Sequence, residues 1–182
     1  MERAIGVIEL RSIAKGIEST DAMLKAADVF LIDSRPVCPG KYLIVVGGEV
    51  GSVENSVQAG EQVGSEYLVD SIVIPNVAEE VFPAINAATD VAKLEALAVV
   101  ETFSLTGAIL SADTMVKAAG VHLIEIRLAK GLGGKAFVLA TGSVGDCKAS
   151  IAAVNAEFKE KGLIIEEVVI PNPHPDLETV LF

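Results

Sequence analysis

The residue of this chain whose type and setting most favour chemistry is Cys38. It lies in the segment 34–41, where Pro36 and Pro39 restrict the backbone and Gly40 permits a turn. A cysteine on a rigid polar loop differs from the usual buried structural thiol, so it is a candidate metal ligand. One thiolate per chain is nevertheless a poor metal motif, because an iron–sulfur cluster generally takes four ligands.

A second loop, 130–135, reads Lys-Gly-Leu-Gly-Gly-Lys and exposes backbone N–H groups that favour phosphate. It lacks the spacing of a Walker A motif, since Lys130 precedes the glycines, and a tight turn is the better interpretation. Cys147, the other cysteine, stands at the start of a predicted helix and is interpreted as a small core thiol.

The remaining reactive side chains predict no enzyme and no catalytic residue. His122 is predicted to be a partly buried strand residue, and His174, between two prolines, a surface or edge residue. Neither has a His or Glu partner at a metal-binding spacing, and no Gly-x-Gly-x-x-Gly follows a predicted strand. The chain therefore carries no convincing acid–base pair, triad or dinucleotide fingerprint.

Composition excludes several classes of protein. The 182 residues are 51% hydrophobic with a net charge of −11, too apolar for disorder and too acidic for nucleic-acid binding as the main role. No apolar run approaches a membrane span, and the first residues do not read as a signal peptide, which predicts a cytoplasmic protein with reduced cysteines. The mean hydropathy of +0.52 suggests further surface buried between subunits.

The chain is internally repeated, which fixes the elements that must position Cys38. Residues 6–9 match 98–101, and 21–27 match 113–119, both at an offset of 92. The offset becomes 94 for 48–51 against 142–145, and 96 for Ile-Pro-Asn at 74–76 against 170–172. Insertions confined to loops indicate tandem duplication, and the predicted domains are residues 1–92 and 93–182.

Each copy is predicted to fold as β-α-β-β-α-β, an α+β arrangement of one sheet with helices on one face. The first predicted helix spans 19–27, with Ser19 or Thr20 as its N-cap, and its counterpart spans 111–119. The strands are predicted at 4–10, 29–32, 42–46 and 68–74, and the second helix at 53–63. A short helix is predicted near 79–83 in the connector, and another is one interpretation of the tail after Pro175.

The order and repetition of these motifs resemble the bacterial microcompartment (BMC) shell domain. The resemblance rests on Gly-Val-Ile-Glu, on Asp-Ala-Met-Leu-Lys-Ala-Ala and on Gly-Glu-Val-Gly, and it covers both halves of the chain. It implies an unpermuted tandem member that forms a homotrimer shaped like the flat hexamers of single-domain relatives. It also places Lys25, Lys117, Asn172 and His174 at the lateral edge where tiles meet; Asn172 stands where the family often has arginine.

In this family, the loops between the second and third strands surround a central pore. The resemblance therefore assigns two sets of pore residues, Pro36, Val37, Pro39 and Gly40 in the first copy and Lys130, Gly131, Leu132, Gly133 and Gly134 in the second. Threefold symmetry would bring three copies of Cys38 together, enough for three corners of a [4Fe–4S] cube. The loop resembles that of a tandem subgroup from propanediol-utilising compartments whose central cysteine carries such a cluster.

The resulting expectation is a shell tile with Cys38 as ligand of a [4Fe–4S] cluster shared by three chains, for electron transfer across the shell. Expected partners are other shell proteins and encapsulated redox enzymes, with no nucleic acid and no membrane. Two alternatives stay open: the same tile with an open metabolite pore, and a trimeric small-molecule sensor.

Overall fold

The computed structural model describes residues 3–91, 93–129, 131–158 and 160–181 of the chain. The chain divides into two compact units, Met1–Val77 and Ala78–Phe182. The division expected from the repeats, between residues 92 and 93, falls inside the segment that joins the last strand of the first unit to the first strand of the second.

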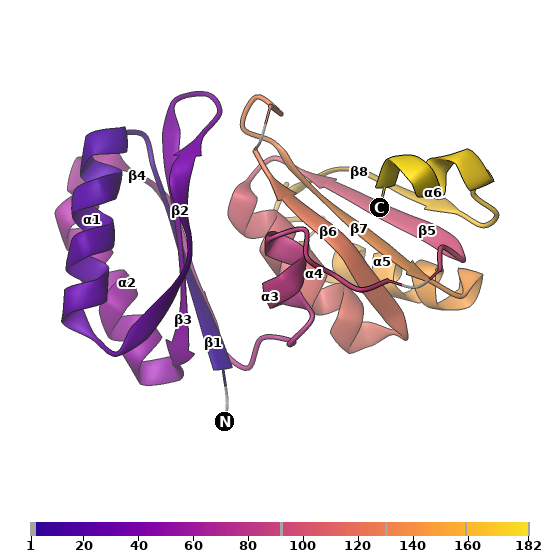
Figure 1. Cartoon of the computed structure of the whole chain (residues 1–182), viewed down its shortest axis with the longest axis horizontal. Helices are drawn as coiled ribbons and strands as arrows, with labels where there is room; N and C mark the ends of the chain where they lie inside the picture. The colour runs from indigo at the N-terminus through magenta and orange to yellow at the C-terminus, as the bar shows by residue number, and fades with distance from the viewer. Residues whose placement is uncertain (1–2, 92, 130, 159, 182) are drawn as a thin grey trace. The chain divides into compact units, whose positions relative to one another are not determined.

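The first unit has the predicted order of strands and helices. It contains β1 (Arg3–Leu10), α1 (Ile13–Ala26), β2 (Val29–Val37), β3 (Lys41–Glu49), α2 (Val50–Gly64), the 3-10 turn η1 (Ser65–Tyr67) and β4 (Leu68–Ile74). The strands form one antiparallel sheet in the order β2-β3-β1-β4, and both helices lie on one face of it (Figure 1). Ile8, Leu10, Ile44 and Val46 alternate toward those helices and form the core with Met23 and Val57.

The second unit repeats this arrangement after a connector. It contains α3 (Val81–Ile85), β5 (Ala96–Thr102), α4 (Leu105–Ala118), β6 (Val121–Leu128), β7 (Ala136–Gly142), α5 (Val144–Phe158), β8 (Ile164–Ile170) and α6 (Pro175–Leu181). Its sheet has the order β6-β7-β5-β8, which matches the first sheet strand for strand. The two sheets even share a register shift, between Leu31 and Asp33 and between Leu123 and Glu125.

In the second unit, the sheet face that points away from α4 and α5 is covered by other segments of the same unit. Leu97, Ile124 and Leu139 form a small buried cluster there. Val91 and Leu94 of the connector and Leu181 of α6 pack against that cluster. The connector and the tail helix, which extend the basic repeat, therefore bury apolar sheet surface of the second unit.

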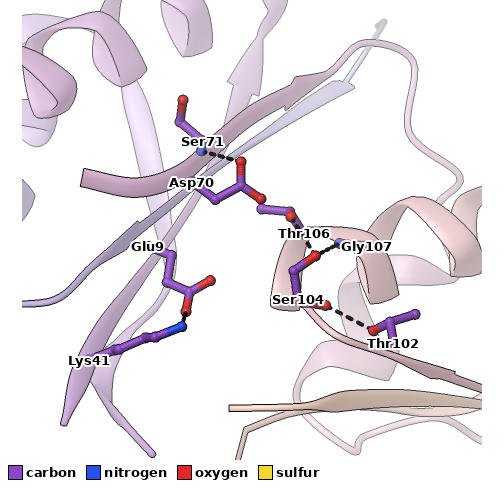
Figure 2. Close-up of polar contacts among 8 residues, drawn as sticks. All are labelled: Glu9, Lys41, Asp70, Ser71, Thr102, Ser104, Thr106 and Gly107. Atoms are coloured by element: carbon purple, nitrogen blue, oxygen red, sulfur yellow. Dashed lines mark hydrogen bonds and ion pairs between the residues drawn. The ribbon is translucent and has the colours of Figure 1, made fainter. Parts of the chain in front are cut away.

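The first helix of each unit begins six residues before the predicted position, at Ile13 rather than 19 and at Leu105 rather than 111. The prediction that Ser19 or Thr20 caps α1 is wrong: Ser12 is the N-cap, its hydroxyl accepting a hydrogen bond from the Lys15 N–H at 3.3 Å. Ser104 caps α4 in the same way, accepting from the Gly107 N–H at 3.1 Å (Figure 2). Ser19 and Thr20 are instead buried inside the helix, so cap-type residues in mid-helix misplaced the start.

The hairpin that carries Cys38 is also longer than predicted, because β2 continues to Val37. Pro36 and Val37 pair with Tyr42 and Lys41, so they belong to the strand and not to the loop. Pro36 is tolerated because β2 is an edge strand, where a residue without an N–H removes no bond that the sheet needs. Only residues 38–40 remain for the turn.

The α-helices of the described residues are at most 15 residues long, and none combines the length and the apolar character needed to cross a membrane.

Candidate functional site

Cys38 lies at the exposed tip of the β2–β3 hairpin. Val37 pairs with Lys41, which leaves Cys38, Pro39 and Gly40 as the turn, and all three are exposed. Gly40 has a φ of 80°, a left-handed conformation that suits glycine, and a Cβ there would meet nothing. The structure thus presents the Cys38 thiol on a three-residue turn at the end of a paired hairpin, accessible to a ligand outside the chain.

On the helix side of the sheet, three hydroxyl groups join this hairpin to α1. The Tyr42 phenol and the Ser34 hydroxyl are 3.0 Å apart, and the Ser34 and Thr20 hydroxyls are also 3.0 Å apart. The Thr20 hydroxyl donates to the Gly16 carbonyl at 2.8 Å. We call Thr20, Ser34 and Tyr42 the hydroxyl chain.

On the opposite side of the sheet, an ion pair holds the same hairpin. Lys41 Nζ lies 2.6 Å from Glu9 Oε1, and the Glu9 side chain is only 2% exposed (Figure 2). The second unit repeats the pair as Lys135 and Glu101, at 3.0 Å, but there the carboxylate is 37% exposed. An ion pair between a glutamate and a lysine thus lies at the base of the hairpin in each unit.

Removal of Lys41 tests how much the buried carboxylate depends on its partner. Lys41→Met is expected to lower the free energy of unfolding by about 3 kcal/mol, because Glu9 would keep a buried charge without a counterion. Lys135→Met is the matched control and should cost less than about 1 kcal/mol, since Glu101 stays solvated. Urea denaturation of both variants measures the difference, and equal losses would contradict this account.

The corresponding hairpin of the second unit has a longer turn of a different kind. Leu128 pairs with Ala136, so the residues between them form the tip. Gly131, Gly133 and Gly134 all adopt positive φ, which only glycine does readily, and Leu132 accepts a hydrogen bond from the Lys135 N–H at 3.2 Å. The predicted pore residue Lys130 lies outside the described residues. This geometry agrees with the tight turn preferred for the glycine-rich loop.

Cys147 is a core thiol, as predicted. It is fully buried near the start of α5, and the Ala96 and Gly142 carbonyl oxygens lie 3.7 and 3.8 Å from its sulfur, where either can accept from the single S–H. Burial raises the pKa of the Cys147 thiol, and the nearby Asp146 and Glu95 carboxylates raise it further. A thiol held protonated in this way is a poor metal ligand, which leaves Cys38 as the accessible one.

The predicted edge residues are spread over exposed surfaces of both units. Lys25 and Lys117 occupy the last turns of α1 and α4 and pair with Asp21 and Asp113 at 2.6 Å. Asn172 and His174 lie in the exposed segment between β8 and α6. These positions are available to a neighbouring molecule, and the intramolecular pairs are the contacts that such a neighbour would have to replace.

His122 differs from its prediction. It was expected to be partly buried, but its side chain is 70% exposed and lies 3.4 Å from Glu80. The strand position is right; the error arises because β6 is an edge strand and its outward residue faces solvent. Among the described residues, no group of three or more His, Cys, Asp and Glu side chains is arranged to hold a metal ion.

The second unit also has a cavity of about 870 Å³ that the sequence did not indicate. Two of its carboxylates are engaged by the chain itself: Glu80 accepts from the Leu123 N–H at 3.1 Å, and Asp146 accepts from the Ser143 hydroxyl at 2.5 Å. The His122–Glu80 pair, 3.4 Å apart, also lines this cavity, which belongs to the second unit and not to the unit that carries Cys38.

These features define a duplicated α+β module, and comparison with known proteins identifies its family. The BMC domain model matches residues 4–77 and 96–173. The chain therefore belongs to the BMC domain family, as a tandem member with two copies of the domain.

Particular relatives refine this assignment. The chain is 42% identical to the bacterial microcompartment shell protein PduT of Citrobacter freundii, over 97% of this chain and 96% of that protein. One half resembles the single-domain shell protein EutM of Salmonella typhimurium, at 39% identity over 48% of this chain and 88% of EutM. A microcompartment protein of Desulfitobacterium hafniense has a crystal structure that matches with a TM-score of 0.94 at 44% identity, covering 98% of this chain and 99% of that one. The chain is thus a structural shell protein of the PduT type.

Sequence reasoning missed the hydroxyl chain. The signal was present, because Thr20, Ser34 and Tyr42 align with Ala112, Ile126 and Ala136 of the second unit. Differences between the two copies mark the residues that only the cysteine-bearing unit has.

Proposed function

We propose that three chains form a flat, pseudohexagonal shell tile in which three Cys38 thiolates surround the central axis and hold a [4Fe–4S] cluster. The observation that carries this proposal is the exposed Cys38 at the tip of a braced hairpin in one unit only. The chain itself supplies one accessible thiol, so a cluster has to be shared. Three copies would provide three iron ligands and leave the fourth iron to water or a small molecule.

A comparison of equivalent helices supports assembly from several copies. Ile13 and Ile17 on α1 are 43% and 58% exposed, whereas their counterparts on α4, Leu105 and Ile109, are fully buried within the chain. An apolar helix face that is covered in one copy and open in the other is expected to be covered by a second molecule. Head-to-tail contacts of this kind close into a ring when the rotation between neighbours allows it, and three chains of two units would give a ring of six positions.

When bound, the cluster would supply one-electron transfer at the centre of the tile. Pro36, Val37, Pro39 and Gly40, with the 130–134 segment of the second unit, would line the opening around it. Backbone near the sulfur and the degree of solvent access would then tune the reduction potential. Lys25, Lys117, Asn172 and His174 would meet neighbouring tiles, and encapsulated redox enzymes would exchange electrons with the tile.

Anaerobic reconstitution of the full-length protein with iron and sulfide tests the proposal. The trimer should take up about four irons for every three chains, develop broad visible absorption, and give an electron paramagnetic resonance signal on reduction or oxidation. A trimer that binds no iron above a metal-free blank would overturn the cluster and favour the tile with an open metabolite pore.

Electron microscopy of the same protein separates the tile from a trimeric sensor. A shell tile should form two-dimensional layers of pseudohexagonal particles at high protein concentration. Discrete trimers that never form layers, alone or with other shell proteins, would favour the sensor.

A further inference from the structure

The hydroxyl chain has a fixed direction. A carbonyl oxygen only accepts, so Thr20 uses its single hydroxyl hydrogen on the Gly16 carbonyl. Ser34 must then donate to Thr20, and Tyr42 must donate to Ser34. The hydrogen bonds therefore run one way, from strand β3, through strand β2, into helix α1.

The second unit shows that the fold does not require the hydroxyl chain. Its equivalent positions, Ala112, Ile126 and Ala136, carry no hydroxyl, yet the strands there keep the same order and register. Gly16 also differs between the two units, because the counterpart of Gly16 is Ala108. A Cβ at Gly16 would lie 2.3 Å from the Tyr42 ring. Gly16 and the three residues of the hydroxyl chain, each next to another of the four, thus differ together between the two units.

The buried hydroxyl groups of the first unit are demanding, because each of them needs a hydrogen-bond partner. This requirement argues that the arrangement serves a purpose. Thr20 and Tyr42 are 9% and 7% exposed, and buried hydroxyls destabilise a fold unless each finds a partner. The second unit of the same polypeptide has apolar residues at the equivalent positions. A fully satisfied polar network specifies one arrangement more sharply than apolar packing, because its bonds have fixed distances and angles.

The network lies directly below the Cys38 turn. Tyr42 pairs with Pro36, the next pair is Val37 with Lys41, and the turn follows. The Lys41–Glu9 ion pair braces the other face, but the second unit has that pair too, as Lys135–Glu101. The hydroxyl chain is therefore the brace that distinguishes the cysteine-bearing hairpin from its counterpart.

We propose that Thr20, Ser34 and Tyr42 are positioning residues for Cys38, whose hydrogen bonds tie the hairpin to α1 so that the thiols of three chains hold a constant separation. This inference rests on the proposed function for its purpose, but its first test does not need a cluster. Loss of the hydrogen bonds of the hydroxyl chain should leave the fold and the trimer in place. It should make the turn of residues 38–40 more mobile.

The first test measures hydrogen exchange of the hairpin in the metal-free trimer. Tyr42→Phe is the cleanest variant, because it removes the terminal donor and leaves only a hydroxyl acceptor unpaired. It should speed exchange of amides near the tip by about tenfold, the factor expected for one lost hydrogen bond. Tyr67→Phe is the matched control, because it alters the only other tyrosine of the sequence and Tyr67 is not part of the hydroxyl chain. It should leave the exchange of amides near the tip unchanged. Unchanged exchange in Tyr42→Phe would overturn the proposal.

The second test uses reconstituted protein and a readout that a merely structural residue would not move. Tyr42→Phe and Ser34→Ala should broaden the cluster's electron paramagnetic resonance signal and shorten its lifetime against an iron chelator several-fold. Ser34→Thr keeps the hydroxyl and should restore both. Identical spectra and lifetimes in all variants would overturn the positioning role. Failure of the wild type itself to bind iron would overturn the cluster proposal and leave the exchange result as the test of the brace.

Discussion

Replacement of Cys38 by serine is expected to leave the proposed trimer intact and to abolish the iron uptake that the proposed cluster requires. Cys38 is exposed, so the change takes no side chain out of the core. Serine is a poor substitute because its hydroxyl stays protonated, and a thiolate is the ligand that iron–sulfur clusters use. Iron analysis after anaerobic reconstitution, with size-exclusion chromatography of the same sample, measures both expectations.

Cys147→Ala is the matched control for this experiment. It removes the chain's other thiol from a fully buried site, so it should reduce stability modestly and leave the iron content unchanged. Equal iron in the wild type and in Cys38→Ser would contradict the assignment. Loss of iron in Cys147→Ala with a folded trimer would instead move the ligand to the second unit.

The second large effect is expected at Gly16. Its missing Cβ leaves room for Tyr42: an added Cβ would lie 2.3 Å from Cγ and Cδ1 of the ring and 2.5 Å from the Tyr42 Cβ. Rotation of the ring cannot relieve a clash that includes its own Cβ. Gly16→Ala should therefore lower the free energy of unfolding by about 2 to 3 kcal/mol, despite alanine's better helix propensity.

The second unit supplies the compensating change, because Ala108 and Ala136 occupy the equivalent positions and are fully buried. Tyr42→Ala alone should cost about 3 kcal/mol through the space it empties. The double variant Gly16→Ala/Tyr42→Ala should lose less than the sum of the two single changes, by about 1.5 kcal/mol or more. Chemical denaturation of all four proteins closes the cycle, and strictly additive losses would show that the two side chains do not compete for space.

Much of the architecture could be predicted because the chain contains its own alignment. Two copies of each motif identified the strands at 4–10 and 68–74 and the order of elements, and both prove correct within a residue. The helix starts could not be placed, since Ser19, Thr20 and Asp21 resemble a cap more closely than Ser12 does. What distinguishes Ser19 and Thr20 from a true cap is their burial, which is a tertiary property.

The candidate site was predictable only in part for a similar reason. A cysteine between prolines is visible in a sequence, and its exposure followed from that setting. The hydroxyl chain joins residues 20, 34 and 42 from three elements, and no local pattern relates them. Their relation becomes visible only when the helix lies across the hairpin, or when the two copies are compared position by position.

Because the two modules are joined in one polypeptide, a substitution in one module need not occur in the other. In a ring of identical single modules, every substitution at the centre appears in every position, so a bulky or reactive residue would be repeated six times around one small opening. Here the 38–40 turn and its longer counterpart before Ala136 are encoded by different codons. Selection can therefore change either turn on its own.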